Sequence, residues 1–224
     1  MPRRRYKRKP YRKYRRKPSG FLRKTGSGLT RSFPLGKKFT FKTRYVESQV
    51  AIDPAAGGVP QTWIFSLNGL FDPDISGGGH SALGFDEMMT MYNHYTVIGA
   101  RVRATFVNTD TTYAQNVSLS LKDSTTATAN FSQTIENGTS RWACVGTDGS
   151  PKTLSLNCSI SKFSGKKILS DDIFRGTISS NPAEQVYLHA QVSPTDAVNS
   201  AKVMMTIVIE FIAIMTEPKT LTQS

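Results

Sequence analysis

The side chains most able to do chemistry crowd the start of the chain. Residues 1–17 read MPRRRYKRKPYRKYRRK, and 11 of these 17 residues are lysine or arginine. Lysine and arginine neutralise phosphates and release condensed counterions, which gives salt-dependent binding to nucleic acid without sequence preference. Arginine outnumbers lysine by seven to four in this stretch, and this favours bidentate contacts to phosphate.

Three tyrosines, Tyr6, Tyr11 and Tyr14, are interleaved with these cations. Aromatic rings stack on unpaired bases, a contact worth about 1–3 kcal/mol per base, so the pattern predicts binding of single-stranded nucleic acid. Two other interpretations fit the same residues: a nuclear-import signal with no further role, and a segment that binds anionic membrane or a heparin-like polymer. The predicted nucleic-acid-binding residues are Arg3, Arg4, Arg5, Tyr6, Lys7, Arg8, Lys9, Tyr11, Arg12, Lys13, Tyr14, Arg15, Arg16 and Lys17.

Residue patterns for enzymatic or metal chemistry are not found in the rest of the sequence. His80, His94 and His189 do not lie at metal-ligand spacing from one another or from a cysteine. No G-x-S-x-G, no glycine-rich phosphate loop followed by Lys-Ser/Thr and no H-E-x-x-H occurs. Asp72-Pro-Asp74 lacks the acidic density of a calcium loop and is interpreted as a turn. We therefore expect no catalytic residue, no metal and no cofactor, and we interpret His189 as an ordinary surface or interface histidine.

Two smaller groups of reactive residues have structural interpretations. Ser170 is predicted to be an N-cap. The carboxylates of Asp171 and Asp172, which follow it, favour the start of a short helix. Cys144 and Cys158 are too few for a disulfide framework, so we expect two thiols in the core.

Charge divides the chain into two parts. Residues 1–44 hold 18 lysines and arginines and neither aspartate nor glutamate, whereas residues 45–224 hold 11 basic and 16 acidic residues. A dense cationic block cannot bury enough apolar surface to offset the entropy of ordering, and it repels itself. We predict a basic, disordered nucleic-acid-binding arm and linker over residues 1–36 and one folded domain over residues 37–224.

Neither a membrane span nor a secretory signal is expected. The most apolar run, residues 203–215, has thirteen residues and contains Glu210, and a span needs about 20. No apolar segment follows the basic N-terminus in the manner of a signal peptide. We therefore expect no membrane insertion and no export by the ordinary secretory route.

Period-2 alternation of apolar and polar residues predicts an all-β domain. The last of the expected strands carries an unbroken apolar face from Val203 to Met215. Helical spacing is confined to residues 85–94 and 164–176, while residues 69–84 and 123–140 are expected to be loops. Eight strands without βαβ alternation predict an antiparallel jelly-roll sandwich. The expected strands are about 38–52, 62–68, 96–107, 116–122, 141–145, 152–162, 185–193 and 202–216.

Two of these strands have features of their own. The apolar parity of the first strand changes near Tyr45, which predicts a bulge or a bend there. Arg101 and Arg103 share the polar face of a later strand. They could extend the basic surface of the arm, lie on a solvated sheet face or contact another subunit.

The chain resembles capsid proteins of the circovirus-like group of small circular single-stranded DNA viruses. The resemblance rests on the arginine-rich opening, the eight strands and the segment FDEMMTMYNHYTVIGARVRATFVN at residues 85–108. It implies a virion protein that assembles about sixty copies into an icosahedral shell and packages a single-stranded DNA genome through the arm. It also implies a nuclear import receptor as a partner and assembly in the host nucleus.

Other classes of protein share parts of this layout. An arm joined to a jelly roll also describes capsids of small RNA viruses. A cellular nucleic-acid-binding protein of the ribosomal or chromatin-associated type would use the basic tail and stay monomeric or join a heterologous complex. A lectin-like or cupin jelly roll would give the arm no role.

Overall fold

The structure is a computed structural model that describes residues 35–55, 57–196 and 198–221. The described strands and helices all lie in the second of two units of the chain, Gly36–Ser224. The predicted nucleic-acid-binding residues 3–17 lie outside the described residues.

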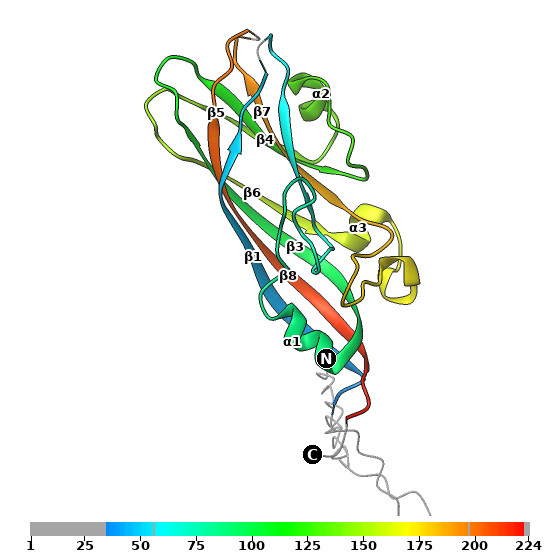
Figure 1. Ribbon diagram of the computed structural model, residues 1–224. Coiled ribbons are helices and arrows are strands. Elements are labelled where there is room, and N and C mark those ends of the chain that lie inside the picture. The colour runs from blue at the N-terminus through cyan, green and yellow to red at the C-terminus, as the bar shows by residue number, and fades with distance from the viewer. Residues whose placement is uncertain (1–34, 56, 197, 222–224) are drawn as a thin grey trace, which may run out of the picture. The chain divides into compact units, whose positions relative to one another are not determined.

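Eight strands and a few short helices make up the second unit (Figure 1). The strands are β1 Lys38–Ile52, β2 Gln61–Ser66, β3 Tyr92–Asn108, β4 Gln115–Lys122, β5 Ser140–Val145, β6 Lys152–Ser159, β7 Tyr187–Pro194 and β8 Val203–Pro218. The helices are α1 Phe85–Met91, α2 Phe131–Glu136, α3 Ile160–Ser164 and the 3₁₀ turns η1 Ile168–Ser170 and η2 Asp172–Phe174.

The strands form two four-stranded sheets, in the orders β1-β8-β3-β6 and β2-β7-β4-β5. Every pair of neighbouring strands is antiparallel. The first and last strands of the sequence thus lie side by side, and the chain crosses repeatedly between the sheets. This confirms the predicted eight-stranded antiparallel jelly roll.

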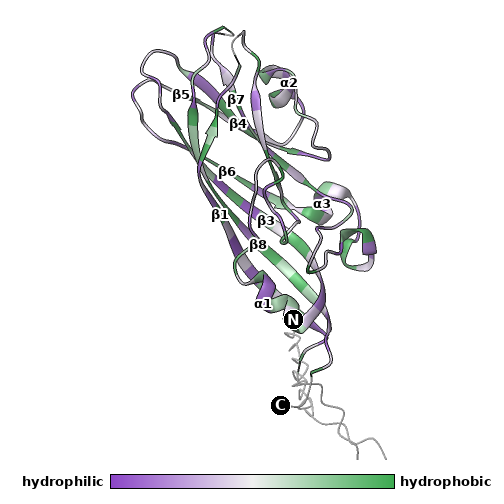
Figure 2. Cartoon of the chain, in the orientation of Figure 1, coloured by the Kyte–Doolittle hydropathy of each residue, from purple (hydrophilic) through white to green (hydrophobic). Residues whose placement is uncertain are grey.

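One apolar core lies between the two sheets. Val203, Ile207, Phe211 and Met215 of β8 are buried, and they belong to an alternating pattern of buried and more exposed residues along the strand. The same alternation brings Val102 and Phe106 of β3 into the core, and Figure 2 shows hydrophilic and hydrophobic residues alternating along the strands. Each large side chain buried in this way stabilises the fold by about 1.5–3 kcal/mol.

The parity of β1 changes at a bulge, as predicted, but the bulge lies after Tyr45 rather than at it. The register with β8 shifts between Glu47 and Val50, and Gln49 has a left-handed backbone with φ 61°. The bulge at this point turns Val50 toward the core. Val46 precedes the bulge, shares the outward parity of Arg44 and is exposed.

Three local expectations differ from the structure. The helix predicted over residues 85–94 ends at Met91, because Tyr92 begins the pairing of β3 with β8. Residues 123–140, predicted as a loop, contain α2, whose N-cap Asn130 accepts a 2.8 Å hydrogen bond from the Gln133 backbone N–H. Cys144 is exposed, while Cys158 is buried, and burial raises the pKa of the Cys158 thiol to about 11.

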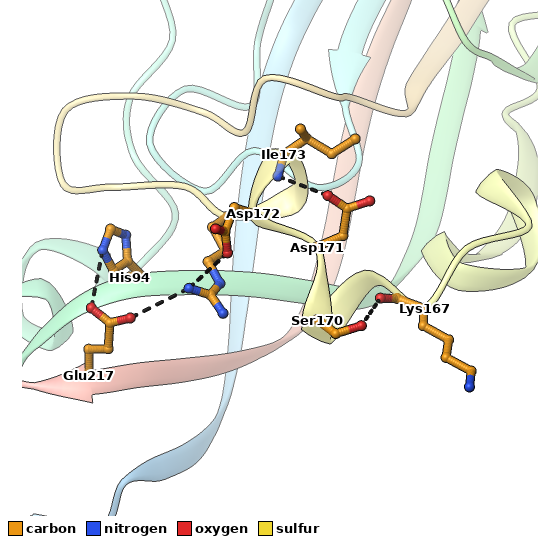
Figure 3. A network of polar contacts seen from close by, with 8 residues as sticks. His94, Lys167, Ser170, Asp171, Asp172, Ile173 and Glu217 are labelled. Atoms are coloured by element: carbon orange, nitrogen blue, oxygen red, sulfur yellow. Dashed lines mark hydrogen bonds and ion pairs between the residues drawn. The ribbon is translucent and has the colours of Figure 1, made fainter.

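The expected cap at Ser170 is also wrong. Asp171 caps η2 by accepting from the Ile173 N–H, while the Ser170 hydroxyl donates to the Lys167 carbonyl (Figure 3). Next to η2, Arg175 Nη1 lies 3.0 Å from Asp172 Oδ1 and 3.5 Å from Glu217 Oε1. The second of these ion pairs links this segment to the end of β8.

Candidate nucleic-acid interface

Four cations and one carboxylate gather on the outward face of the β1-β8-β3-β6 sheet. We call this set the basic face: it consists of Lys42 and Arg44 of β1, Arg101 and Arg103 of β3, and Glu210 of β8. Glu210 pairs in register with Arg44 on one side and with Arg101 on the other. The three side chains therefore form a row across the sheet.

The alternation of β1 and β3 explains why these cations point outward. Val102 lies between Arg101 and Arg103 and is fully buried, as is Tyr45 beside Arg44. Successive side chains of a strand point to opposite faces, so burial of the apolar residues forces the cations into solvent.

A groove of about 710 Å³ lies on this sheet. Its lining includes Lys42, Arg44, Arg101, Asn157, Glu210 and Ile212. Gly99 also lines it and adds no side chain to fill it; a Cβ there would lie 3.2 Å from the Cys158 carbonyl oxygen. A smaller hollow of about 230 Å³ is lined by Arg44, Arg101, Arg103, Val208 and Glu210.

The charges of the basic face do not balance. Arg44 forms a 2.8 Å ion pair with Glu210, and no ion pair among the described residues involves Lys42, Arg101 or Arg103. Arg101 and Arg103 are about 7 Å apart along β3, and β1 and β3 are separated by two strand spacings, about 10 Å. These distances are close to the Debye length at physiological salt, about 8 Å, so the cations repel one another and attract a polyanion.

Sequence reasoning found the parts of this face separately. It placed Arg101 and Arg103 on one polar strand face and traced the basic region as far as Arg44, and the structure brings these residues together. It gave no role to Glu210 in this row. Which strand lies beside which is a property of the topology, and no local pattern in the sequence shows it.

His189 is not the surface histidine that its strand position predicts. Its side chain is buried under residues 123–139, and its Nε2 lies 2.9 Å from the Ser124 carbonyl oxygen. Burial, with a smaller effect of the nearby Lys122 charge, lowers the pKa of this imidazole.

The acidic sequence Asp72-Pro-Asp74 precedes a turn rather than forming the predicted one: Asp74 makes an isolated antiparallel bridge with Phe65, and the turn follows at residues 75–78. The buried Asp74 carboxylate accepts hydrogen bonds from the backbone N–H groups of Ser76 at 3.1 Å and Gly77 at 3.0 Å, and from Trp63 Nε1 at 2.8 Å. Burial raises the pKa of Asp74 although these bonds oppose the shift. Within the described ranges, no group of three or more His, Cys, Asp or Glu is placed to hold a metal.

No helix in the described part of the chain is long and apolar enough to cross a membrane.

Comparisons with known proteins find similarity in structure but not in sequence. No family model and no curated protein matches the chain. A semi-empty VLP of the giant freshwater prawn Macrobrachium rosenbergii nodavirus is similar over 96% of this chain and 100% of that chain, with 8% identity and a TM-score of 0.48. Mud crab tombus-like virus is similar over 84% and 94% of the two chains, with 14% identity and a TM-score of 0.47. Turnip yellow mosaic virus is similar over 84% and 99%, with 13% identity and a TM-score of 0.44.

The circovirus-like DNA-virus group stays a prediction from the sequence.

Proposed function

We propose that the chain is the capsid protein of a small icosahedral virus, a structural rather than catalytic protein. The observation that carries the proposal is the strand order of a complete eight-stranded jelly roll, attached to a densely basic segment. Jelly rolls serve as viral capsid domains, lectins and cupins. Of these, only a capsid protein has an evident use for an arm that binds a nucleic-acid backbone.

Exposed apolar side chains support contact between copies of the chain. Phe163, Leu169, Ile173 and Ile178 are each between 37% and 46% exposed, and all lie within one short stretch of the sequence. Exposed apolar surface is typical of protein–protein contact sites. These side chains would be covered in a closed shell.

The size of the arm fits the packaging of a small genome. Residues 1–36 hold 14 basic residues, so sixty copies would carry about 840 positive charges. At about one phosphate per charge, this matches a genome on the order of 10³ nucleotides.

The tyrosines of the arm favour a single strand, and the arm does not distinguish DNA from RNA. Lysine and arginine bind phosphates, and tyrosines stack on bases, which DNA and RNA both offer. The circovirus-like resemblance favours single-stranded DNA, an import receptor and assembly in the host nucleus. The capsid of a small RNA virus is the second candidate, because nothing in the arm excludes RNA.

Electron microscopy of the purified full-length chain tests the proposal. We expect uniform closed particles, and nuclease-protected nucleic acid inside them whose sensitivity to DNase or RNase after disruption identifies the genome type. A chain that stays monomeric, or that joins only a heterologous complex, would contradict the proposal and favour a cellular nucleic-acid-binding protein.

Removal of residues 1–36 should strongly reduce retention of nucleic acid and leave a folded β-domain, because all the described strands lie beyond them. A full-length variant with glutamine at every lysine and arginine of residues 3–17 is the matched control for length. If either variant retains as much nucleic acid as the native chain, the assignment of packaging to the arm is wrong.

A further inference from the structure

We infer that the basic face is a second nucleic-acid contact, which binds phosphates of the packaged strand, so that the β1-β8-β3-β6 sheet faces the particle interior. The inference about orientation rests on the proposed function. The binding of phosphate rests only on Lys42, Arg44, Arg101, Arg103 and the groove between them.

The uncompensated charge of the basic face calls for an anion with several charges. Four cations are opposed by one carboxylate, and that carboxylate is already paired with Arg44. Arg101 and Arg103 stand about two residues, or 7 Å, apart on a rigid strand. A polyanion that passes along this strand can meet both side chains without any change in the backbone.

Nucleic acid fits this face better than a second copy of the chain. A subunit contact would remove the cations from water, and an unpaired buried charge costs several kcal/mol. Charged residues are depleted at the centres of protein interfaces, whereas a protein–nucleic-acid interface is positively charged and stays wet. The exposed apolar residues Phe163, Leu169, Ile173 and Ile178, which suit a subunit contact, lie on other elements.

The contacts on the basic face differ in kind from those expected of the arm. The exposed side chains that line its groove are cationic, polar or aliphatic, such as Arg101, Asn157 and Ile212. They offer phosphate contacts and no aromatic platform for a base. Binding at the basic face is therefore independent of base identity. Its free energy comes from the release of counterions, so the affinity depends on the salt concentration.

The experiment measures this dependence in the full-length chain. Arg101 and Arg103 are replaced together by glutamine, and the affinity for a fluorescent single-stranded oligothymidylate is measured across a range of NaCl concentrations. Each lost phosphate contact lowers the slope of log K against log [salt] by about 0.7, so the double variant should show a slope smaller by about 1.4. A uridine oligonucleotide of the same length should give the same decrease.

Two variants make the measurement specific. Arg141→Gln with Lys162→Gln removes two exposed cations from other elements and should change the slope little. Arg101→Lys with Arg103→Lys keeps both charges and should restore the native slope. Thermal unfolding of each variant checks the fold. An unchanged slope in Arg101→Gln/Arg103→Gln, or an equal decrease in the Arg141/Lys162 control, overturns the inference.

Particle formation separates this inference from the proposed function. If the Arg101→Gln/Arg103→Gln chain forms closed particles with an unchanged salt slope, the capsid proposal stands and the second contact is wrong. If it loses assembly but keeps the slope, the basic face is a subunit contact, and the inference is again overturned. If the native chain forms no particles while the slope falls as expected, the phosphate contact stands and the inward orientation fails with the capsid proposal.

Discussion

The outward face of the β1-β8-β3-β6 sheet is open and charged, whereas the outward face of the β2-β7-β4-β5 sheet is polar and covered. Arg101 and Arg103 are exposed on the first, while His189 and Gln191 are buried on the second. The cover is the connection between β4 and β5, which includes α2 (Figure 1). The polar side chains of the two sheets alternate with apolar ones in the same way, yet they lie in solvent on one sheet and in a buried polar layer on the other.

The covered layer depends on side-chain hydrogen bonds. Gln191 accepts from the Thr134 hydroxyl at 2.7 Å and donates to the Thr128 carbonyl at 3.1 Å. Within the described residues, the buried hydroxyls of Ser118 and Ser120 have no hydrogen-bond partner. Because an unsatisfied buried polar group costs about 1–3 kcal/mol, this layer is sensitive to small changes, and the open face is not.

The largest effect on stability is expected at Gln191. Gln191→Ala leaves the Thr128 carbonyl without its side-chain partner and leaves the Thr134 hydroxyl only its longer 3.3 Å bond to the Asn130 carbonyl. It should lower the free energy of unfolding by about 1–3 kcal/mol. Urea-induced unfolding measures it. The exposed Gln133→Ala on α2 is the control and should change stability by less than about 0.5 kcal/mol. Equal losses in the free energy of unfolding for the two variants would mean that the hydrogen bonds between Gln191 and the cover do not stabilise the fold.

Sequence reasoning predicts the strands of both sheets well and their covering poorly. The alternation from Val203 to Met215 identifies β8 because burial acts on every second residue. The cover has no such pattern: α2 is short and polar, and Asn130 was the available signal of its start. The burial of His189 is a tertiary effect of residues distant in the sequence, so local periodicity cannot show it. For the same reason, Arg44, Glu210 and Arg101 could be found separately but not as a row.

A smaller effect is expected from protonation of His189. Because burial lowers the pKa of His189 in the folded state, the unfolded chain binds its proton first as the pH falls. The contribution of this residue is therefore fully favourable above its ordinary pKa of about 6.5, and stability is lost as the pH falls from there toward the lower folded pKa. Urea unfolding on either side of pH 6.5 should show this loss.

Two variants assign this dependence on pH. His189→Gln should reduce it, because the group that binds a proton on unfolding is gone. His80→Gln, at an exposed histidine, is the matched control for the replacement of a histidine by glutamine. An undiminished dependence in His189→Gln would show that protonation of other groups dominates, and that the cover over β7 tolerates a charged imidazole.

The smallest effect on stability is expected on the open face, at Glu210. Its ion pair with Arg44 joins side chains that are 44% and 59% exposed, and an exposed pair contributes about 0–1 kcal/mol. Glu210→Gln should therefore hardly change thermal unfolding, yet it removes the one carboxylate of the basic face and frees Arg44 for phosphate. Binding of single-stranded oligothymidylate should become tighter, with a salt slope larger by up to about 0.7. Weaker binding would mean that Glu210 positions Arg44 for its ligand, and unchanged binding would mean that no phosphate reaches this row. On the open, charged face we expect substitutions to alter binding and barely alter stability. In the buried layer of the other sheet we expect them to alter stability and barely alter binding.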